Sequence, residues 1–284
     1  MKAALITDTH WGIRNDSAIY HSYFDKFYTN VFFPYLKKHD IKTIFHLGDI
    51  VDRRKYINYV TLNAFKNIFI QPCIENDIDL HVIVGNHDIP YRNTNEVNAM
   101  KELFNHCHLY DMKAQDIEFD GMTIAMLPWI NSGNYNEMMK FIDGTKSQVL
   151  FGHLELEGFQ MYAGQIQSSG MDIKPFEKFD LVCSGHYHHR STKGNISYLG
   201  SPYELTWNDY NDSRGFHIFD SETRQNEFIP NPYKMFYKVW YDDTDMNLEH
   251  YTNMDFSDYA ETSVKVIVKN KNKHNSDNVF MIQV

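Results

Sequence analysis

The first half of the chain alternates short apolar runs with longer segments in which apolar residues recur every three or four positions. Apolar runs at residues 3–7, 43–47 and 80–84 are each followed by Asp or Gly, and we interpret them as buried strands. Residues 17–38 and 60–75, which lie between them, have the spacing of amphipathic helices. This alternation predicts a layered α/β fold in which polar residues gather where strands end.

From about residue 118 onward, strand-like patterns dominate. Short apolar runs closed by turn residues lie at residues 122–127, 149–152, 181–184, 196–199 and 215–220. We predict that these runs form a second sheet packed on the first. The expected fold class is therefore α/β, a two-sheet β-sandwich flanked by helices.

The pattern changes again near residue 230. Strand-like runs at 235–241 and 263–268 flank an acidic polar stretch. We predict that residues 1–230 form the main domain and that residues 231–284 form a small C-terminal α+β capping domain, whose completeness stays open.

The C-terminal segment is basic, although the chain as a whole carries a formal net charge of −10. Lys265, Lys269, Lys271 and Lys273 lie in and after one predicted strand, and residues 279–283 are strand-like again. We favour a solvated strand and loop here, with contact to nucleic acid or a partner as the alternative. The net charge argues against a protein that coats nucleic acid, but it leaves a nuclease open, since bound divalent cations would invert the local field.

Length and composition favour an intracellular globular protein. With 284 residues, 43% of them hydrophobic, the chain is long enough to bury a substantial core. Its three cysteines are widely spaced and form no C-x-x-C pair, so neither a disulfide framework nor a zinc ribbon is implied, and a reducing cytoplasm fits. The N-terminus has no secretory h-region, and no apolar stretch approaches the roughly 20 residues of a membrane span. We expect a soluble, unexported protein with no membrane contact.

Polar segments rich in Asp, Asn and His follow the predicted strands. They are Asp8-Thr9-His10, Gly48-Asp49-Ile50-Val51-Asp52-Arg53, Gly85-Asn86-His87-Asp88, Gly152-His153 and Gly185-His186-Tyr187-His188. Such side chains are ligands for divalent metals, and a two-metal site can activate a water while it holds phosphoryl oxygens. Any one segment alone is weak, since a histidine after glycine is more often an ordinary turn residue. Together they predict a phosphoesterase with two metal ions, because strand ends rarely collect so many polar groups without a ligand.

The order of these segments resembles the calcineurin-like metallophosphoesterases from Asp8 to His188. Within that superfamily the chain is most similar to the SbcD-type DNA exonuclease subunits of double-strand-break repair and to phage recombination exonuclease subunits. This likeness covers most of the first 235 residues and extends to Leu127-Pro128-Trp129, Gly152-His153-Leu154-Glu155-Leu156-Glu157-Gly158-Phe159, Gly200-Ser201-Pro202 and Arg214-Gly215-Phe216.

The resemblance implies two divalent metal ions, with manganese favoured and magnesium, iron or zinc as alternatives. It assigns Asp8, His10, Asp49 and His188 to one metal, and Asp49, Asn86, His153 and His186 to the other, so that Asp49 is the bridge. It also implies that His87 contacts the scissile phosphate and assists the leaving oxygen, while Asp88 orients His87. Arg53 is a candidate phosphate contact, with a salt bridge to a nearby acid as an equal alternative.

Asp52 departs from part of the family. Eukaryotic and archaeal relatives have a second histidine at this position, whereas bacterial and phage relatives resemble this chain. We interpret Asp52 as a carboxylate that orients His10 or His188 rather than as an acid catalyst.

The function implied by the resemblance is a metal-dependent DNA nuclease in recombination, repair or replication, acting in a bacterial or phage-infected cytoplasm. Its expected activities are 3′-to-5′ exonuclease action on double strands and endonuclease action on single strands. One alternative is a phosphatase or small-molecule phosphodiesterase on the same scaffold, but serine/threonine phosphatases have Gly and Arg where this chain has Arg54 and Val84. The other alternative is a non-catalytic binding module that keeps the fold.

SbcD-type relatives dimerise and act with an SbcC-type ATPase, which binds the capping domain and a C-terminal helical segment. No amphipathic helix pair is evident after the predicted cap, so the ATPase partner stays open. We expect a homodimer. The aromatic stripe of Tyr20, Tyr23, Phe24 and Phe27 is a candidate dimer face, although apolar stripes with this spacing more often face a core.

Overall fold

The computed structural model describes residues 1–104, 106–242, 244, 253 and 255–270. The chain separates into two compact units, Met1–Tyr233 and Lys234–Val284. No helix among the described residues is long and apolar enough to cross a bilayer.

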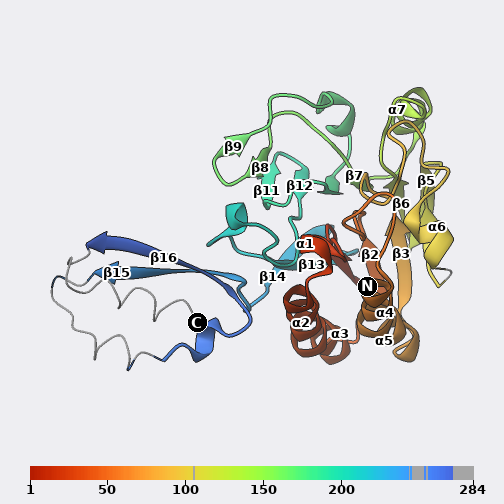
Figure 1. The fold of residues 1–284 in the computed structure, drawn as a ribbon. Helices are drawn as coiled ribbons and strands as arrows, with labels where there is room; N and C mark the ends of the chain where they lie inside the picture. The colour runs from red at the N-terminus through yellow and green to blue at the C-terminus, as the bar shows by residue number, and fades with distance from the viewer. Residues whose placement is uncertain (105, 243, 245–252, 254, 271–284) are drawn as a thin grey trace. The chain divides into compact units, whose positions relative to one another are not determined.

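The first sheet of the larger unit has six strands in the order β14-β13-β1-β2-β3-β4 (Figure 1). Their bounds are Lys2–Ile6 (β1), Thr43–His46 (β2), Asp79–Ile83 (β3), His108–Tyr110 (β4), Gly215–Asp220 (β13) and Gln225–Pro230 (β14). Strands β1 to β4 run parallel, whereas β13 runs antiparallel to β1 and to β14. The central strands β1 and β2 are buried almost throughout, as expected for parallel strands covered on both faces.

The second sheet also has six strands, in the order β11-β12-β10-β7-β6-β5. Their bounds are Gln115–Phe119 (β5), Met122–Leu127 (β6), Val149–His153 (β7), Leu181–Gly185 (β10), Ser191–Lys193 (β11) and Ile196–Tyr198 (β12). The central strands β6, β7, β10 and β12 are parallel. A separate hairpin of β8 (Gln160–Tyr162) and β9 (Gln165–Ile166) is inserted between β7 and β10.

The main core lies between the two sheets. Leu5, Phe45 and Phe219 from the first sheet pack with Met126 and Phe151 from the second in one buried cluster. A second cluster covers the outer face of the second sheet, where Met138 and Ile142 of helix α7 (Tyr135–Gly144) pack beside buried residues of the sheet's strands. The structure therefore confirms the predicted two-sheet sandwich flanked by helices.

The helices of the larger unit are short. Their bounds are Ile13–Asp16 (α1), Ala18–Phe27 (α2), Phe33–Lys38 (α3), Tyr59–Phe65 (α4), Gln71–Glu75 (α5), Ala99–Leu103 (α6) and Tyr135–Gly144 (α7), with 3₁₀ turns at Lys174–Phe176 and Trp207–Asp209. The two long helices predicted from the sequence each contain a π-helical turn, at Tyr28–Phe32 and Lys66–Ile70. Each π turn comes just before a proline, Pro34 or Pro72. Proline lacks an N–H and crowds the preceding turn, and a widened turn accommodates it without ending the helical segment.

The aromatic stripe on α2 faces the core. Tyr20, Tyr23, Phe24 and Phe27 are all buried, and the Phe24 ring stacks on Tyr203 with centroids 4.1 Å apart. The suggestion that this stripe forms a dimer face is therefore wrong, and the core-facing alternative is correct.

The smaller unit contains a two-stranded parallel sheet of β15 (Phe236–Asp242) and β16 (Ser263–Asn270), with a 3₁₀ turn at Ser257–Tyr259. Both strands were expected from the sequence. The strand predicted at 279–283, together with Lys271 and Lys273, lies outside the described residues.

Candidate metal centre

All the predicted ligand segments meet at one edge of the sandwich, because each lies in or just after the carboxyl end of a parallel strand. The first sheet contributes Asp8 and His10 after β1, Asp49 after β2 and Asn86 after β3, and the second contributes His153 from β7 and His186 and His188 after β10. Segments separated by as many as 180 residues are thereby brought together.

The backbone at several of these residues is strained. Asp8 (φ 54°), His10 (φ 44°), Asp49 (φ 54°) and His186 (φ 90°) all have left-handed conformations. This region costs an L-residue about 1–2 kcal/mol, although Asp tolerates it better than most. Such strain tends to be retained where it positions functional groups, and it marks this edge as a functional site.

Two glycines allow the strand ends to approach closely. A Cβ atom on Gly85 would clash with the backbone nitrogen of Asp49, and one on Gly185 would overlap the Thr7 hydroxyl and lie 2.8 Å from Nδ1 of His153. Glycine is required at both positions because backbone and ligand side chains occupy that space.

The first ligand group consists of Asp8, His10 and His188. One ligand atom from each lies within 4.8 Å of the others. The Nε2 atoms of His10 and His188 face each other at 3.0 Å. Burial, together with the nearby His10, lowers the pKa of His188 well below its usual value, so this imidazole is neutral and has a lone pair to offer. This geometry fits a shared cation.

Asp52 lies behind His10. The Nδ1 atom of His10 is 3.5 Å from Oδ1 of Asp52, which is long for a hydrogen bond but close enough for an ion pair. Burial lowers the pKa of His10, but the carboxylates of Asp52, Asp49 and Asp8 together raise it more. With its Nδ1 directed at Asp52, His10 presents Nε2 to the ligand group, as outer carboxylates commonly arrange for metal-bound histidines.

The second ligand group converges on the side-chain oxygen of Asn86. That oxygen lies 2.9 Å from Nδ1 of His186 and 3.0 Å from Nε2 of His153. His153 donates its Nδ1–H to the Leu47 carbonyl oxygen at 2.7 Å, which directs Nε2 into the group. This arrangement fits a second cation.

Asp49 lies between the two groups. Its Oδ2 atom is 3.4 Å from Nε2 of His153 and 3.9 Å from Nε2 of His10. Burial would raise its pKa, but His153 beside it holds the pKa well below the ordinary value, and the pKa of His153 is in turn raised to about 9. A buried, ionised carboxylate between two sets of ligand atoms suits a bridge between cations.

His87 is held by the backbone rather than by Asp88. It donates Nδ1–H to the Asp52 carbonyl oxygen at 2.7 Å, and its backbone N–H donates to Oδ1 of Asp49 at 2.7 Å. The prediction that Asp88 orients His87 is therefore wrong. The hydrogen bond at Nδ1 selects the tautomer and leaves Nε2 for a substrate.

Asp88 instead binds the turn that carries Asp49. Its Oδ1 accepts from the backbone N–H groups of Ile50 (2.9 Å) and Val51 (3.2 Å), and its Oδ2 accepts from those of Asp49 and Gly85 (both 2.9 Å). Burial, and to a lesser degree Asp49, raises the pKa of Asp88 to about 7, while the amide hydrogen bonds oppose that shift. The carboxylate fixes the strained turn on which the bridging candidate sits.

A sequence comparison decides the family. The profile of calcineurin-like phosphoesterases matches residues 1–190. The chain belongs to this family. It is 36% identical to Exonuclease subunit 1 of Enterobacteria phage T4 over 243 residues, which are 84% of this chain and 69% of that protein. It is 26% identical to the SbcD subunit of the nuclease SbcCD of Staphylococcus epidermidis over 268 residues, 81% of this chain and 69% of that protein.

Among solved structures, the chain is similar to a dimetal phosphatase from Danio rerio. The match has a TM-score of 0.48 and 10% sequence identity, and it covers 77% of this chain and 91% of the phosphatase. The calcineurin-like phosphoesterase family implies binding of two divalent metal ions. The buried carboxylates and imidazoles described above suit such ions.

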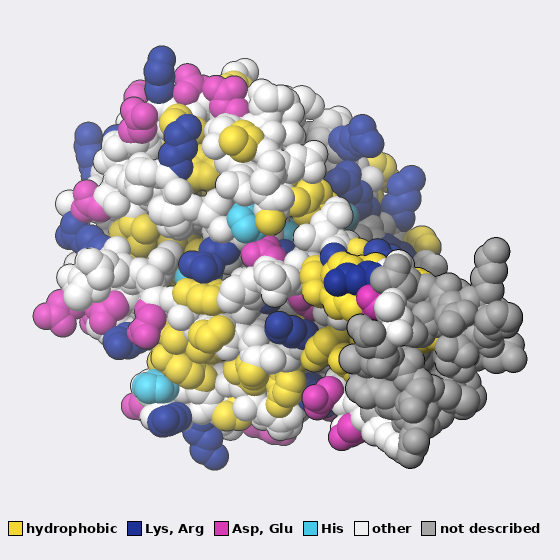
Figure 2. Space-filling model, turned by 90° about the vertical axis from the view of Figure 1, so that its left-hand side faces the viewer, with side chains coloured by type: hydrophobic (Ala, Val, Ile, Leu, Met, Phe, Trp, Pro, Cys, Tyr) yellow, Lys and Arg dark blue, Asp and Glu magenta, His cyan; other side chains and the backbone are white. Residues whose placement is uncertain are grey.

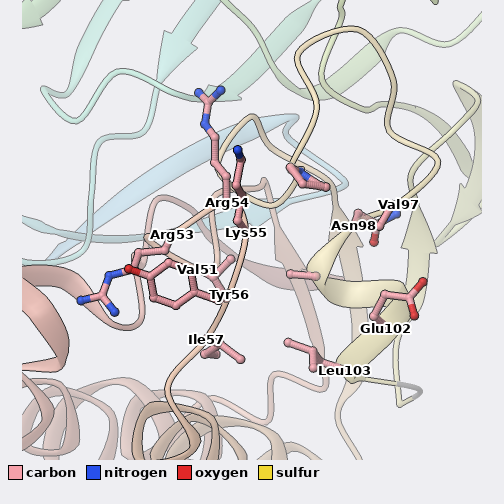
Figure 3. A pocket seen from close by; sticks show the side chains of 12 residues that line it. Val51, Arg53, Arg54, Lys55, Tyr56, Ile57, Val97, Asn98, Glu102 and Leu103 are labelled. Atoms are coloured by element: carbon pink, nitrogen blue, oxygen red, sulfur yellow. The ribbon is translucent and has the colours of Figure 1, made fainter.

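A basic loop with Arg53, Arg54 and Lys55 follows Asp52, and only Arg53 was predicted from the sequence as a phosphate contact. Arg53 turns away and pairs with Asp16 at 2.7 Å, which is the salt-bridge alternative. Arg53, Arg54 and Lys55 all line a cavity of about 220 Å³, and the side chains of Arg54 and Lys55 extend side by side from the loop (Figure 3). Burial is the main cause of the lowered pKa of His87, and the charge of Arg54 lowers it further. In the sequence, the run of three basic residues after Asp52 indicates this loop.

One face of the molecule combines histidine, charged and hydrophobic side chains (Figure 2). Figure 2 shows a face on which histidine side chains reach the surface near the centre, with basic and acidic side chains beside them and hydrophobic side chains gathered below.

Proposed function

We propose that this phosphoesterase is a metal-dependent DNA nuclease, with 3′-to-5′ exonuclease action on duplex DNA and endonuclease action on single strands. The observation that carries the proposal is the 36% identity to a phage exonuclease subunit across 84% of the chain. The nuclease subunit from Staphylococcus epidermidis supports it independently. The metal centre alone would serve many phosphate esters, so the choice of DNA rests on these relatives.

We propose that the site binds two divalent metal ions and that manganese is the favoured metal. The residue sets are those predicted from the sequence, namely Asp8, His10, Asp49 and His188 for one ion and Asp49, Asn86, His153 and His186 for the other. When bound, such ions lower the pKa of water and offset negative charge on phosphoryl oxygens. The position of Asp49 Oδ2, between His153 and His10, supports its role as the bridge.

We propose that His87 assists departure of the 3′-oxygen as an imidazolium. Its Nδ1–H stays on the Asp52 carbonyl oxygen, and a second proton, taken up at Nε2 before the step, passes from Nε2 to the leaving oxygen and returns His87 to its neutral form. Arg54 and Lys55 are proposed as phosphate contacts. Arg53, the original candidate, is bound to Asp16 and also donates to Asn15 at 3.0 Å, so it is better suited to hold the loop in place.

The test is a comparison of substrates with the purified chain and Mn²⁺. End-labelled linear duplex should lose nucleotides from its 3′ ends, circular single strands should be nicked, and a phosphopeptide should release no phosphate. Phosphopeptide hydrolysis with intact DNA would favour the phosphatase alternative. Failure to bind any divalent metal would favour the non-catalytic binding module.

We further propose that residues 1–230 are the nuclease domain, that residues 231–284 are a capping domain, and that the protein works in the cytoplasm with an SbcC-type ATPase. The support is the relative whose name makes it one subunit of an SbcCD nuclease. The test is co-purification: the full chain should co-purify with an SbcC-type ATPase, and a chain without residues 231–284 should not.

We also propose a homodimer, formed through an exposed apolar surface beside the basic loop. Tyr59 at the start of α4 is 87% exposed, and Tyr56, Val60 and Val97 are exposed as well. Tyr56 and Val97 also line the cavity in Figure 3. Neighbouring apolar side chains left in water favour burial against a second copy.

Replacing Tyr59 with aspartate should therefore convert a dimer into a monomer in sedimentation velocity, because a charge would have to be buried in the interface. The matched control is Tyr135→Asp, another exposed tyrosine at the start of a helix, α7, which should leave the dimer intact. A wild-type chain that sediments as a monomer at micromolar concentration would contradict the proposal.

A further inference from the structure

A second group of metal-ligating side chains lies on the first sheet, outside the nuclease site. Asp79 and His81 are two residues apart on β3, so their side chains share one face of the strand. His108 on β4 pairs directly opposite His81 in the parallel ladder. The register of two strands, rather than a flexible loop, brings the three side chains together.

The distances within this group are short. Nε2 of His81 lies 3.0 Å from one carboxylate oxygen of Asp79, and Nε2 of His108 lies 2.9 Å from the other. One ligand atom from each residue lies within 4.8 Å of the others, as in the group of Asp8, His10 and His188. An ordinary surface ion pair needs one histidine, whereas here each of two imidazoles directs its Nε2 atom at one carboxylate.

His81 is oriented in the way that metal-ligating histidines usually are. Its Nδ1 lies 2.6 Å from the Tyr110 hydroxyl, and its ring packs against Phe45 with centroids 4.8 Å apart. A partner on Nδ1 fixes the ring and leaves the lone pair of Nε2, which faces the Asp79 carboxylate, to bind a cation.

We propose that Asp79, His81 and His108 bind one Zn²⁺ ion. Two imidazoles and one carboxylate are a donor set that suits zinc, which is held tetrahedrally by nitrogen and oxygen ligands. The side chains of Asp79 and His108 are 52% and 63% exposed, so the fourth position is open to water.

The effect of this ion is to tie down a short edge strand. β4 has three residues and pairs with β3 on one side. The carbonyl oxygen of Tyr110 at its end accepts from the N–H of Val84 at 3.0 Å, and Val84 directly precedes the segment that carries Asn86. Zinc linking His108 to Asp79 and His81 therefore stabilises the strand end that supports the nuclease site, without taking part in the reaction.

The test is the number of Zn²⁺ ions bound per chain, measured by calorimetric titration and by metal analysis after dialysis. His108→Ala should bind one Zn²⁺ fewer than the wild type and lose part of the Zn²⁺-induced rise in Tm. His106→Ala is the matched control, since His106 is also an exposed histidine two residues away but lies outside the group. It should behave like the wild type.

Because His108 is exposed, its replacement should leave the fold intact, and Asp79→Asn provides a second variant with the same expected loss. Mn²⁺-dependent nuclease activity should be unchanged in all three variants. Equal Zn²⁺ stoichiometry in His108→Ala and the wild type would overturn the zinc site. That result would leave the proposed nuclease untouched, since it is read from metal binding alone.

Discussion

Replacing Asp49 with asparagine is expected to lower Mn²⁺-dependent DNA cleavage by about 10³-fold or more. Asp49 is the carboxylate that lies between the two ligand groups, and its other oxygen accepts the backbone N–H of His87 at 2.7 Å. Removing the charge weakens both cation sites at once and loosens the position of His87. Asparagine keeps the size of the side chain and tolerates the left-handed backbone at φ 54°, so the fold should survive.

The measurement is the initial rate on end-labelled duplex, with metal content and Tm determined on the same preparation. His87→Ala provides the contrast, because it should retain its metals while losing turnover by about 10²-fold. An Asp49→Asn protein that keeps its metals and more than about a tenth of wild-type activity would exclude the bridging role.

The Asp88→Ala substitution should lower the free energy of unfolding by roughly 3–5 kcal/mol. The side chain is fully buried and accepts from four backbone N–H groups, those of Asp49, Ile50, Val51 and Gly85. Alanine would leave these donors without an acceptor in a dry interior, where each unpaired group costs about 1–3 kcal/mol before the structure relaxes.

Urea unfolding followed by circular dichroism would measure this loss. Asp52→Ala is the control, since the Asp52 side chain is 26% exposed and its removal should cost about 1 kcal/mol or less. If Asp88→Ala unfolds at the same urea concentration as the wild type, the turn does not depend on the carboxylate. Metal binding should weaken in parallel with stability, because the same turn presents Asp49.

The sequence predicted the strands beneath the metal centre well, because buried parallel strands are continuous apolar runs with abrupt polar ends. It predicted the outer strands poorly. β5 and β14 carry alternating or mainly polar residues, as edge strands do, and give little contrast with loops. Helix α7 was also missed, although its buried residues Met138 and Ile142 lie four positions apart, the spacing of an amphipathic helix.

Within the site, the sequence identified which residues gather but not which hydrogen bonds they make. Asp88 was expected to hold its neighbour His87, yet it binds a turn nearly 40 residues earlier in the chain. The partner of His87 is a backbone carbonyl, and every residue has one, so no residue type could reveal it. Arg53 and Arg54 are adjacent and chemically identical, so the sequence could not tell which of the two pairs with Asp16; the course of the loop in the structure decides it in favour of Arg53.

The meeting of distant strand ends at the metal centre also bears on the order of folding. The N–H of His186 donates to both oxygens of Asp8 at 3.1 Å, a contact between residues 178 positions apart in the sequence. Bringing such distant segments together costs chain entropy that local contacts do not, so we expect the ligand set to be completed late in folding. Metal ions that bind the completed set are therefore expected to slow unfolding and to have little influence on the rate of folding.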